Sequence, residues 1–290
     1  MRSRLRDFEL RAPRTLDEAL ALLSAEPGQW RPFAGGTDLM VLIDAARLPP
    51  ARYLSLWHLR ELHGITLHDD EIVLGALTTY TDVLRSRALQ VECPLLCRAA
   101  AETGSVATQN RGTIGGNIAN ASPAADTPPA LLVYDAGLDL LSARGIRRVP
   151  YDRFHLGYKH MDLAPDELIA AVRVARGRGG WTHGWRKVGT RRAQAISKVG
   201  FAAALDLSQH VVRDVRLAFA SVAPTVVRAA HAEAAIRGRT LNGDTIRACC
   251  DALARDISPI DDIRSTAGYR ARVSRNLLEE FLAAALKREA

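Results

Sequence analysis

An adjacent pair of glycines interrupts the stretch Pro32-Phe33-Ala34-Gly35-Gly36-Thr37-Asp38-Leu39, in which we expect a strand to run into a tight turn that opens a helix. Glycine lets the backbone adopt a positive φ and lets an anion approach closely, because no Cβ stands in the way. Successive N–H groups at such a turn, beside a helix N-terminus, form a nest suited to a pyrophosphate. An ordinary strand-to-helix turn, with Asp38 in the first turn of the helix, explains the same residues without a ligand.

A second glycine pair follows about eighty residues later, in the stretch Arg111-Gly112-Thr113-Ile114-Gly115-Gly116-Asn117-Ile118-Ala119-Asn120-Ala121-Ser122-Pro123-Ala124-Ala125-Asp126. Thr113 and Asn117 bracket this pair, so we expect backbone donors with side-chain hydrogen bonds at hand. Asp126 is an acceptor for sugar or ribityl hydroxyls. The alternative is an irregular surface loop in which Asn and Ser make turns. A shared role in binding one extended dinucleotide explains two such loops better than two unrelated turns do.

The order of expected elements indicates an α+β fold, because strands and helices are mixed without a regular βαβ alternation. We expect strands near 8–12, 31–34, 52–57, 65–67, 72–74 and 167–174, and helices near 15–23, 39–46, 81–86 and 94–102. The segment 104–129 is rich in Gly, Asn, Ser, Thr and Pro, and we expect a long functional loop there. Gly177–Gly180 marks a domain boundary. Beyond it we expect an antiparallel sheet from 181–188, 199–207 and 211–222, and helices at 229–236, 245–254 and 267–286.

Charge and hydropathy exclude several classes of protein. The net charge is +7, from 39 Lys and Arg against 32 Asp and Glu. The basic residues are scattered and form no stripe interleaved with aromatic residues, which argues against a nucleic-acid partner. No apolar run reaches the length of a membrane span. Acidic Asp7 and Glu9 follow the basic start, where a signal peptide needs an apolar core, so we expect a cytoplasmic protein.

The cysteines Cys93, Cys97, Cys249 and Cys250 do not have the spacing of an iron–sulfur or zinc site. We expect them to be reduced thiols that pack as small hydrophobic residues. We therefore predict no metal ligands in this chain.

The two glycine stretches together resemble the FAD-binding medium subunit of the molybdenum hydroxylases. That family includes the medium subunits of carbon monoxide dehydrogenase and bacterial xanthine dehydrogenase. The resemblance continues in order and spacing through Phe154–Tyr158, Pro165–Ile169, Trp185–Gly189 and Asp262–Arg270, and so covers essentially the whole chain.

The sequence departs from the family pattern in three respects. Gln109 stands where many relatives carry Arg, and Ala195 stands where many carry Asp. Ala195 lies in the segment 188–198, which can control access to a flavin, so the preferred electron acceptor stays open. The chain also lacks the cysteine-rich insertion of some relatives.

The resemblance implies a p-cresol methylhydroxylase-type FAD-binding domain of two subdomains, at 1–57 and 58–176, and a small C-terminal α+β domain with an antiparallel sheet at 181–290. It places Pro32–Leu39 and Thr113–Asn117 on the pyrophosphate and adenosine side of FAD. It also implies that Asp126 bonds the sugar-like chain of the flavin. The remaining cofactor contacts that it implies come from Thr103, at a position that is aromatic in some relatives, and from Ile169 and Lys187 near the ring.

Lys187 has an alternative role as one solvated charge among Arg186, Arg191 and Arg192.

The function that the resemblance implies is electron transfer from a small iron–sulfur subunit, through FAD, to NAD, oxygen or another carrier. A large subunit would carry the molybdopterin and oxidise the substrate, and the complex would be a dimer of heterotrimers. No acid–base pair is then needed in this chain. Two other functions remain open: a self-sufficient NAD(P)H-dependent flavin reductase on a related FAD fold, and a non-catalytic, basic nucleic-acid-binding module.

Overall fold

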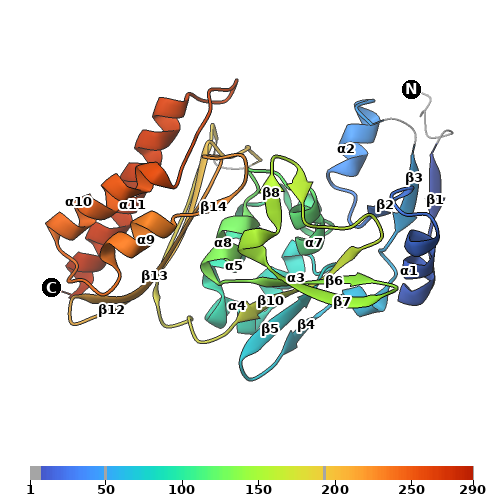
Figure 1. Ribbon diagram of the computed structural model, residues 1–290, viewed down its shortest axis with the longest axis horizontal. Helices are drawn as coiled ribbons and strands as arrows, with labels where there is room; N and C mark the ends of the chain where they lie inside the picture. Colours follow the sequence, from blue (N-terminus) through green and yellow to red (C-terminus); the bar gives the residue numbers. More distant parts are fainter. Residues whose placement is uncertain (1–7, 49–50, 192–193, 290) are drawn as a thin grey trace.

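The computed structural model describes residues 8–48, 51–191 and 194–289. Three parts follow one another along the long axis of the molecule in the order of the sequence (Figure 1). A small N-terminal unit lies at one end, a helix-covered sheet lies in the middle, and a second sheet with its own helices lies at the other end. Helices and largely antiparallel sheets are segregated in this way, which confirms the predicted α+β class.

The N-terminal unit is built on a parallel sheet of strand order β1-β3-β2. Thr15 caps the first helix by accepting the Glu18 N–H at 3.2 Å, while the Glu18 carboxylate accepts from Arg14 rather than from Thr15 itself. The apolar side of this helix packs on Trp30 and Leu54. The elements are β1 (Glu9–Arg11), α1 (Leu16–Ala25), β2 (Trp30–Phe33), α2 (Leu39–Asp44) and β3 (Arg52–Ser55).

The central part is an antiparallel sheet of strand order β4-β5-β10-β6-β7, with a short hairpin and helices beside it. The predicted hairpin around Asp69 and Asp70 is confirmed, because Ile65 pairs with Leu74 and Leu67 with Ile72. The strands are β4 (Ile65–Leu67), β5 (Glu71–Gly75), β6 (Gly137–Ser142), β7 (Gly145–Pro150), β8 (His155–Gly157), β9 (His160–Met161) and β10 (Leu168–Ala175). The helices are η2 (Arg60–Leu62), α3 (Tyr80–Arg85), α4 (Arg87–Glu92), α5 (Pro94–Glu102), α6 (Val106–Gln109), α7 (Ile114–Ala119), α8 (Thr127–Val133) and η3 (Tyr151–Arg153).

The expected long loop at 104–129 is wrong, because α6, α7 and the start of α8 lie within it. The Ser and Thr residues that suggested turns are instead helix N-caps. Ser105 accepts the Thr108 N–H at 3.3 Å, and Thr113 accepts the Gly116 N–H at 3.1 Å. Helix α4 was also not predicted, and it begins at a Ser cap in the same way.

The C-terminal part is an antiparallel sheet of strand order β11-β12-β13-β14 with helices on its outer face, which confirms the predicted sheet. Side chains alternate along β12: Phe201 and Leu205 pack towards the helices, whereas Ala202 and Ala204 join the core of the central part. Both faces of the sheet are therefore covered. The elements are β11 (Thr182–Val188), β12 (Val199–Ser208), β13 (Val211–Ala220), β14 (Val227–Arg228), α9 (Ala230–Ile236), α10 (Gly243–Ala252), η4 (Leu253–Arg255) and α11 (Ala267–Glu289).

The division of the chain at 57 and at 176–181 stays a prediction. Among the helices of the described ranges, none combines the length and the apolar character that a bilayer crossing requires.

The cysteines are free thiols; Cys93, Cys249 and Cys250 are buried and Cys97 is half-buried. Burial raises the pKa of Cys97 to about 11 and that of Cys250 to about 11. A thiolate, not a thiol, attacks an alkylating reagent. At pH 8 we therefore expect alkylation at least about a hundredfold slower in the folded protein than in the denatured one. The rate should rise as the pH approaches 11. Mass spectrometry after timed iodoacetamide treatment measures this, and equal rates in both states would contradict it.

Candidate functional site

The first glycine pair forms a turn whose backbone donors face no protein acceptor. Gly36 has a φ of +76°, which favours glycine, and a Cβ there would stand 2.6 Å from the ring of Phe33. Within the described ranges, no residue accepts a hydrogen bond from the N–H of Gly35, Gly36 or Thr37. Further along, Met40 N–H bonds Gly36 O at 2.9 Å in the first turn of α2. Three successive backbone donors therefore have no acceptor among the described residues, a geometry that suits an anion.

The two glycine stretches lie against each other. A Cβ on Gly35 would stand 1.7 Å from the carbonyl oxygen of Arg111, so the two backbones touch at this point. The Arg111 guanidinium stacks over the ring of Trp57, 3.6 Å from its centroid, and so ties the second stretch to the residues after β3. Ala34 lies next to Gly116, 3.8 Å from the position of a Cβ there. The structure therefore brings together two stretches that the sequence separates by about eighty residues.

The second glycine pair does not offer free backbone donors, contrary to expectation. Ile114 N–H bonds Thr78 O at 3.0 Å, Gly115 N–H bonds Ala76 O at 2.8 Å, and Gly116 N–H bonds the Thr113 hydroxyl. Gly115 is needed for packing, because a Cβ would stand 2.6 Å from that of Ala76.

Asn117 is the polar side chain that this stretch still presents. Its Oδ1 accepts from Thr127 at 2.7 Å, and its amide NH₂ donates to no described residue. Of the two stretches, only the first therefore has a row of backbone N–H groups without a protein acceptor, and the second presents the Asn117 amide.

Asp126 and Lys187 form a buried ion pair between the central and C-terminal parts. Lys187 Nζ donates to Asp126 Oδ2 at 2.7 Å and to Glu102 O at 2.9 Å, and the two side chains are 8% and 13% exposed for Lys187 and Asp126. Burial raises the pKa of Asp126, against the opposing effects of Lys187 and of the Ser197 hydroxyl at 3.0 Å. The alternative of a solvated Lys187 is therefore wrong.

Arg186 and Arg191 do not share this burial, because both are exposed. Arg191 is exposed and donates to Gln194 O at 2.6 Å, and Arg192 lies outside the described residues.

Thr103 and Ile169 border the same region. Thr103 is the C-cap residue of α5, and its hydroxyl donates to Ala99 O at 2.7 Å. It directly follows Glu102, whose carbonyl holds Lys187. Ile169 is buried at a β-bulge of β10, and the next residue, Ala170, accepts from Ala76 N–H at 2.8 Å. Ala76 in turn contacts Gly115, which links Ile169 to the second glycine stretch.

Lys159 is a lysine beside the second glycine stretch that the sequence did not predict as a site residue. Lys159, at the tip of the β8–β9 hairpin, donates to the side chain of Asn120 at 2.7 Å and also to its carbonyl. Burial lowers the pKa of Lys159, and the nearby charge of Asp38 opposes that shift. The stretch Phe154–Tyr158 ends one residue before it, but no spacing rule connects a hairpin tip with a helix that ends near Asn120.

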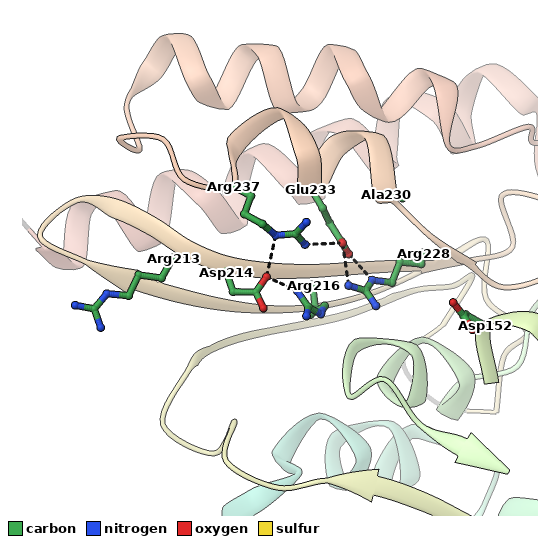
Figure 2. A pocket seen from close by; sticks show the side chains of 8 residues that line it. All are labelled: Asp152, Arg213, Asp214, Arg216, Arg228, Ala230, Glu233 and Arg237. Carbon is green, nitrogen blue, oxygen red and sulfur yellow. Dashed lines mark hydrogen bonds and ion pairs between the residues drawn. The ribbon is translucent and has the colours of Figure 1, made fainter. Parts of the chain in front are cut away.

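A hollow of about 580 Å³ lies elsewhere, between β13, β14, α9 and η3 (Figure 2). Three of its arginines are paired with carboxylates of the same hollow: Glu233 accepts from Arg228 and Arg237, and Asp214 accepts from Arg237 and Arg216. None of its lining residues belongs to the predicted cofactor set. This hollow is a network of ion pairs rather than the cofactor site.

Two family descriptions match the chain in tandem. The family described as FAD binding domain in molybdopterin dehydrogenase matches residues 6–176, and the CO dehydrogenase flavoprotein C-terminal domain matches residues 186–285. These define the class, a flavoprotein in which a C-terminal part follows the FAD-binding part. The chain belongs to the family of FAD-binding medium subunits of the xanthine and carbon monoxide dehydrogenases, and is thus an oxidoreductase subunit.

Individual relatives match over nearly their whole length. The putative xanthine dehydrogenase FAD-binding subunit of Escherichia coli is 32% identical over 276 residues, which is 94% of each chain. The carbon monoxide dehydrogenase medium chain of Hydrogenophaga pseudoflava is 30% identical over 284 residues, 97% of this chain and 98% of the relative. A solved structure of carbon monoxide dehydrogenase from the same organism superposes with a TM-score of 0.92 at 31% identity, covering 98% of both chains.

Proposed function

We propose that this chain takes electrons from an iron–sulfur subunit and passes them through FAD to an external acceptor. FAD supplies the chemistry, since a flavin exchanges single electrons with iron–sulfur clusters and hydride with a nicotinamide. The observation that carries the proposal is the anion nest of Gly35–Thr37, set directly against the second glycine stretch in a member of this family. The residues present fit a dinucleotide, because the free backbone donors of Gly35–Thr37 lie directly beside the second glycine stretch, which would contact the other side of the cofactor.

The chain's own residues bind and orient the cofactor. The N–H groups of Gly35, Gly36 and Thr37 would hold the pyrophosphate, and the Asn117 amide would donate to the adjoining part of the chain. The ion pair of Asp126 and Lys187 would lie near the flavin end of the cofactor. The full proposed set is Pro32, Phe33, Ala34, Gly35, Gly36, Thr37, Asp38, Leu39, Thr103, Thr113, Ile114, Gly115, Gly116, Asn117, Asp126, Ile169 and Lys187.

We further propose a large molybdopterin-binding partner and a small iron–sulfur partner, joined as a dimer of heterotrimers in the cytoplasm. The relatives named as medium chains or FAD-binding subunits support partners of this kind. The four free thiols support a reducing compartment.

We expect the purified chain to be yellow and to release FAD, not FMN, on denaturation. The reason is that the proposed nest binds the pyrophosphate, which FMN lacks. Chromatography of the released flavin identifies it, and titration of the apoprotein with FAD and with FMN compares the two affinities.

A chain that stays colourless after incubation with FAD would contradict the proposal. Substrate-dependent NADPH oxidation by the chain alone would indicate a self-sufficient reductase. A colourless chain with a salt-sensitive mobility shift on RNA or DNA would indicate a nucleic-acid-binding module.

A further inference from the structure

Among the described residues, no hydrogen bond or ion pair joins the segment Asp262–Arg270 directly to a proposed cofactor residue, yet a chain of hydrogen bonds connects the two. Arg270 lies in the first turns of α11 and is 4% exposed. Its Nη1 donates to Ser221 O at 2.6 Å, and its Nη2 donates to Asp262 Oδ1 at 2.7 Å. A buried guanidinium held by two acceptors has little freedom to move.

Asp262 fixes the orientation of this guanidinium. Its Oδ1 also accepts the N–H groups of Arg264 at 2.8 Å and Ser265 at 3.0 Å. Burial works against ionisation of Asp262, but these two donors and Arg270 outweigh it and lower the pKa of its carboxyl. The segment is thus a closed turn that presents Arg270 to the end of β13.

Ser221 links Arg270 to Ser197 and to the second glycine stretch. It is buried and has a φ of +66°, in the left-handed region that a serine seldom adopts. Its carbonyl accepts from Arg270, its hydroxyl donates to Ser197 O at 2.9 Å, and its N–H donates to Pro123 O at 2.7 Å. Pro123 belongs to the second glycine stretch. In this conformation Ser221 makes hydrogen bonds to three different segments through its carbonyl, its hydroxyl and its N–H group.

Ser197 completes the path. It is 1% exposed, and its hydroxyl donates to Asp126 Oδ1 at 3.0 Å. It also lies at the end of the loop between β11 and β12, which closes where Lys198 N–H bonds Val188 O at 2.7 Å, next to Lys187. A second contact comes from the same C-terminal segment, because Lys198 Nζ lies 5.4 Å from the ring centroid of Tyr269.

We propose that Arg270 is a positioning residue for the flavin: through Ser221 and Ser197 it fixes the Asp126–Lys187 pair and the closing end of the β11–β12 loop. The inference rests on the proposed cofactor site. It gives a role to Asp262–Arg270, which otherwise lies outside that site.

The test compares Arg270→Gln, Ser221→Ala, Ser197→Ala and the double variant Ser197→Ala/Arg270→Gln in the full-length, FAD-bound protein. Each single change breaks the same path, so each should raise the dissociation constant of FAD about two- to tenfold. Each should also lower the reduction potential of the flavin, because the Ser197 hydroxyl that compensates the charge of Asp126 is either removed or no longer held in place. The double variant should be no worse than the worse single variant, since both changes break one path.

A matched control separates positioning from general stability. Arg275→Gln removes an exposed arginine of the same helix, which pairs with Asp251 at 2.6 Å. It should leave the FAD affinity and the reduction potential unchanged, and combining it with Ser197→Ala should give the values of Ser197→Ala alone.

Three results would overturn the inference. The first is a folded Arg270→Gln variant with wild-type FAD affinity and reduction potential. The second is a double variant whose loss of FAD affinity equals the sum of the two single losses. The third applies if Arg270→Gln does not fold, and it is a Ser221→Ala variant with wild-type FAD affinity and potential. Failure of the cofactor proposal looks different, because wild type and Asp126→Ala would then bind FAD equally well or not at all.

Discussion

Gly35→Ala is expected to abolish retention of FAD and to destabilise the protein. The added Cβ would stand 1.7 Å from the Arg111 carbonyl oxygen, a distance that no rotamer change can relieve because both groups are backbone. The two glycine stretches must then separate, which removes the wall behind the anion nest. Forcing one extra methyl group into a packed site costs about 1–3 kcal/mol of unfolding free energy.

The measurement is the ratio of visible to ultraviolet absorbance of the purified variant, together with its denaturant unfolding. Gly180→Ala is the matched control, since no atom lies within 4 Å of its Cβ position and its φ is not in the left-handed region. We expect wild-type flavin content in that control. Normal flavin content in Gly35→Ala would show that FAD binding does not need the contact between the two glycine stretches.

Lys187→Ala is expected to cost about 3–5 kcal/mol of unfolding free energy, because it leaves the Asp126 carboxylate buried without its cation. The deficit should shrink as the pH falls, since burial already raises the pKa of Asp126 and protonation removes the unpaired charge. The double variant Asp126→Asn/Lys187→Ala should recover part of the loss. The remaining FAD should have a lower reduction potential, because a nearby cation favours the more negative reduced flavin.

Denaturant unfolding at several pH values and spectroelectrochemical titration test these two effects. Arg186→Ala is the matched control on the same strand, because its side chain is 60% exposed and pairs with Glu280. A loss in Lys187→Ala no larger than in Arg186→Ala would show that the buried pair contributes nothing to stability. An unchanged potential would place Lys187 away from the flavin.

The sequence by itself determined the family, the α+β class and most of the elements. The family followed from a resemblance along the whole chain, whereas short-range signals indicated many of the elements, such as the Thr15 cap of α1 and the turn between β4 and β5. The first glycine turn was also readable, because a positive φ and an open row of donors depend on residues adjacent in the chain. Caps were misread at Ser105 and Thr113, because a serine or threonine favours turns and helix starts alike.

Only the tertiary structure decided which polar groups are still free to bind. The N–H groups of Ile114 and Gly115 are bonded to Thr78 and Ala76, and Lys187 is buried against Asp126 from another part of the chain. Arg270 reaches that pair through Ser221 and Ser197, which lie 24 residues apart. Burial and hydrogen-bond partners depend on segments distant in sequence, and no local pattern encodes which of them will meet.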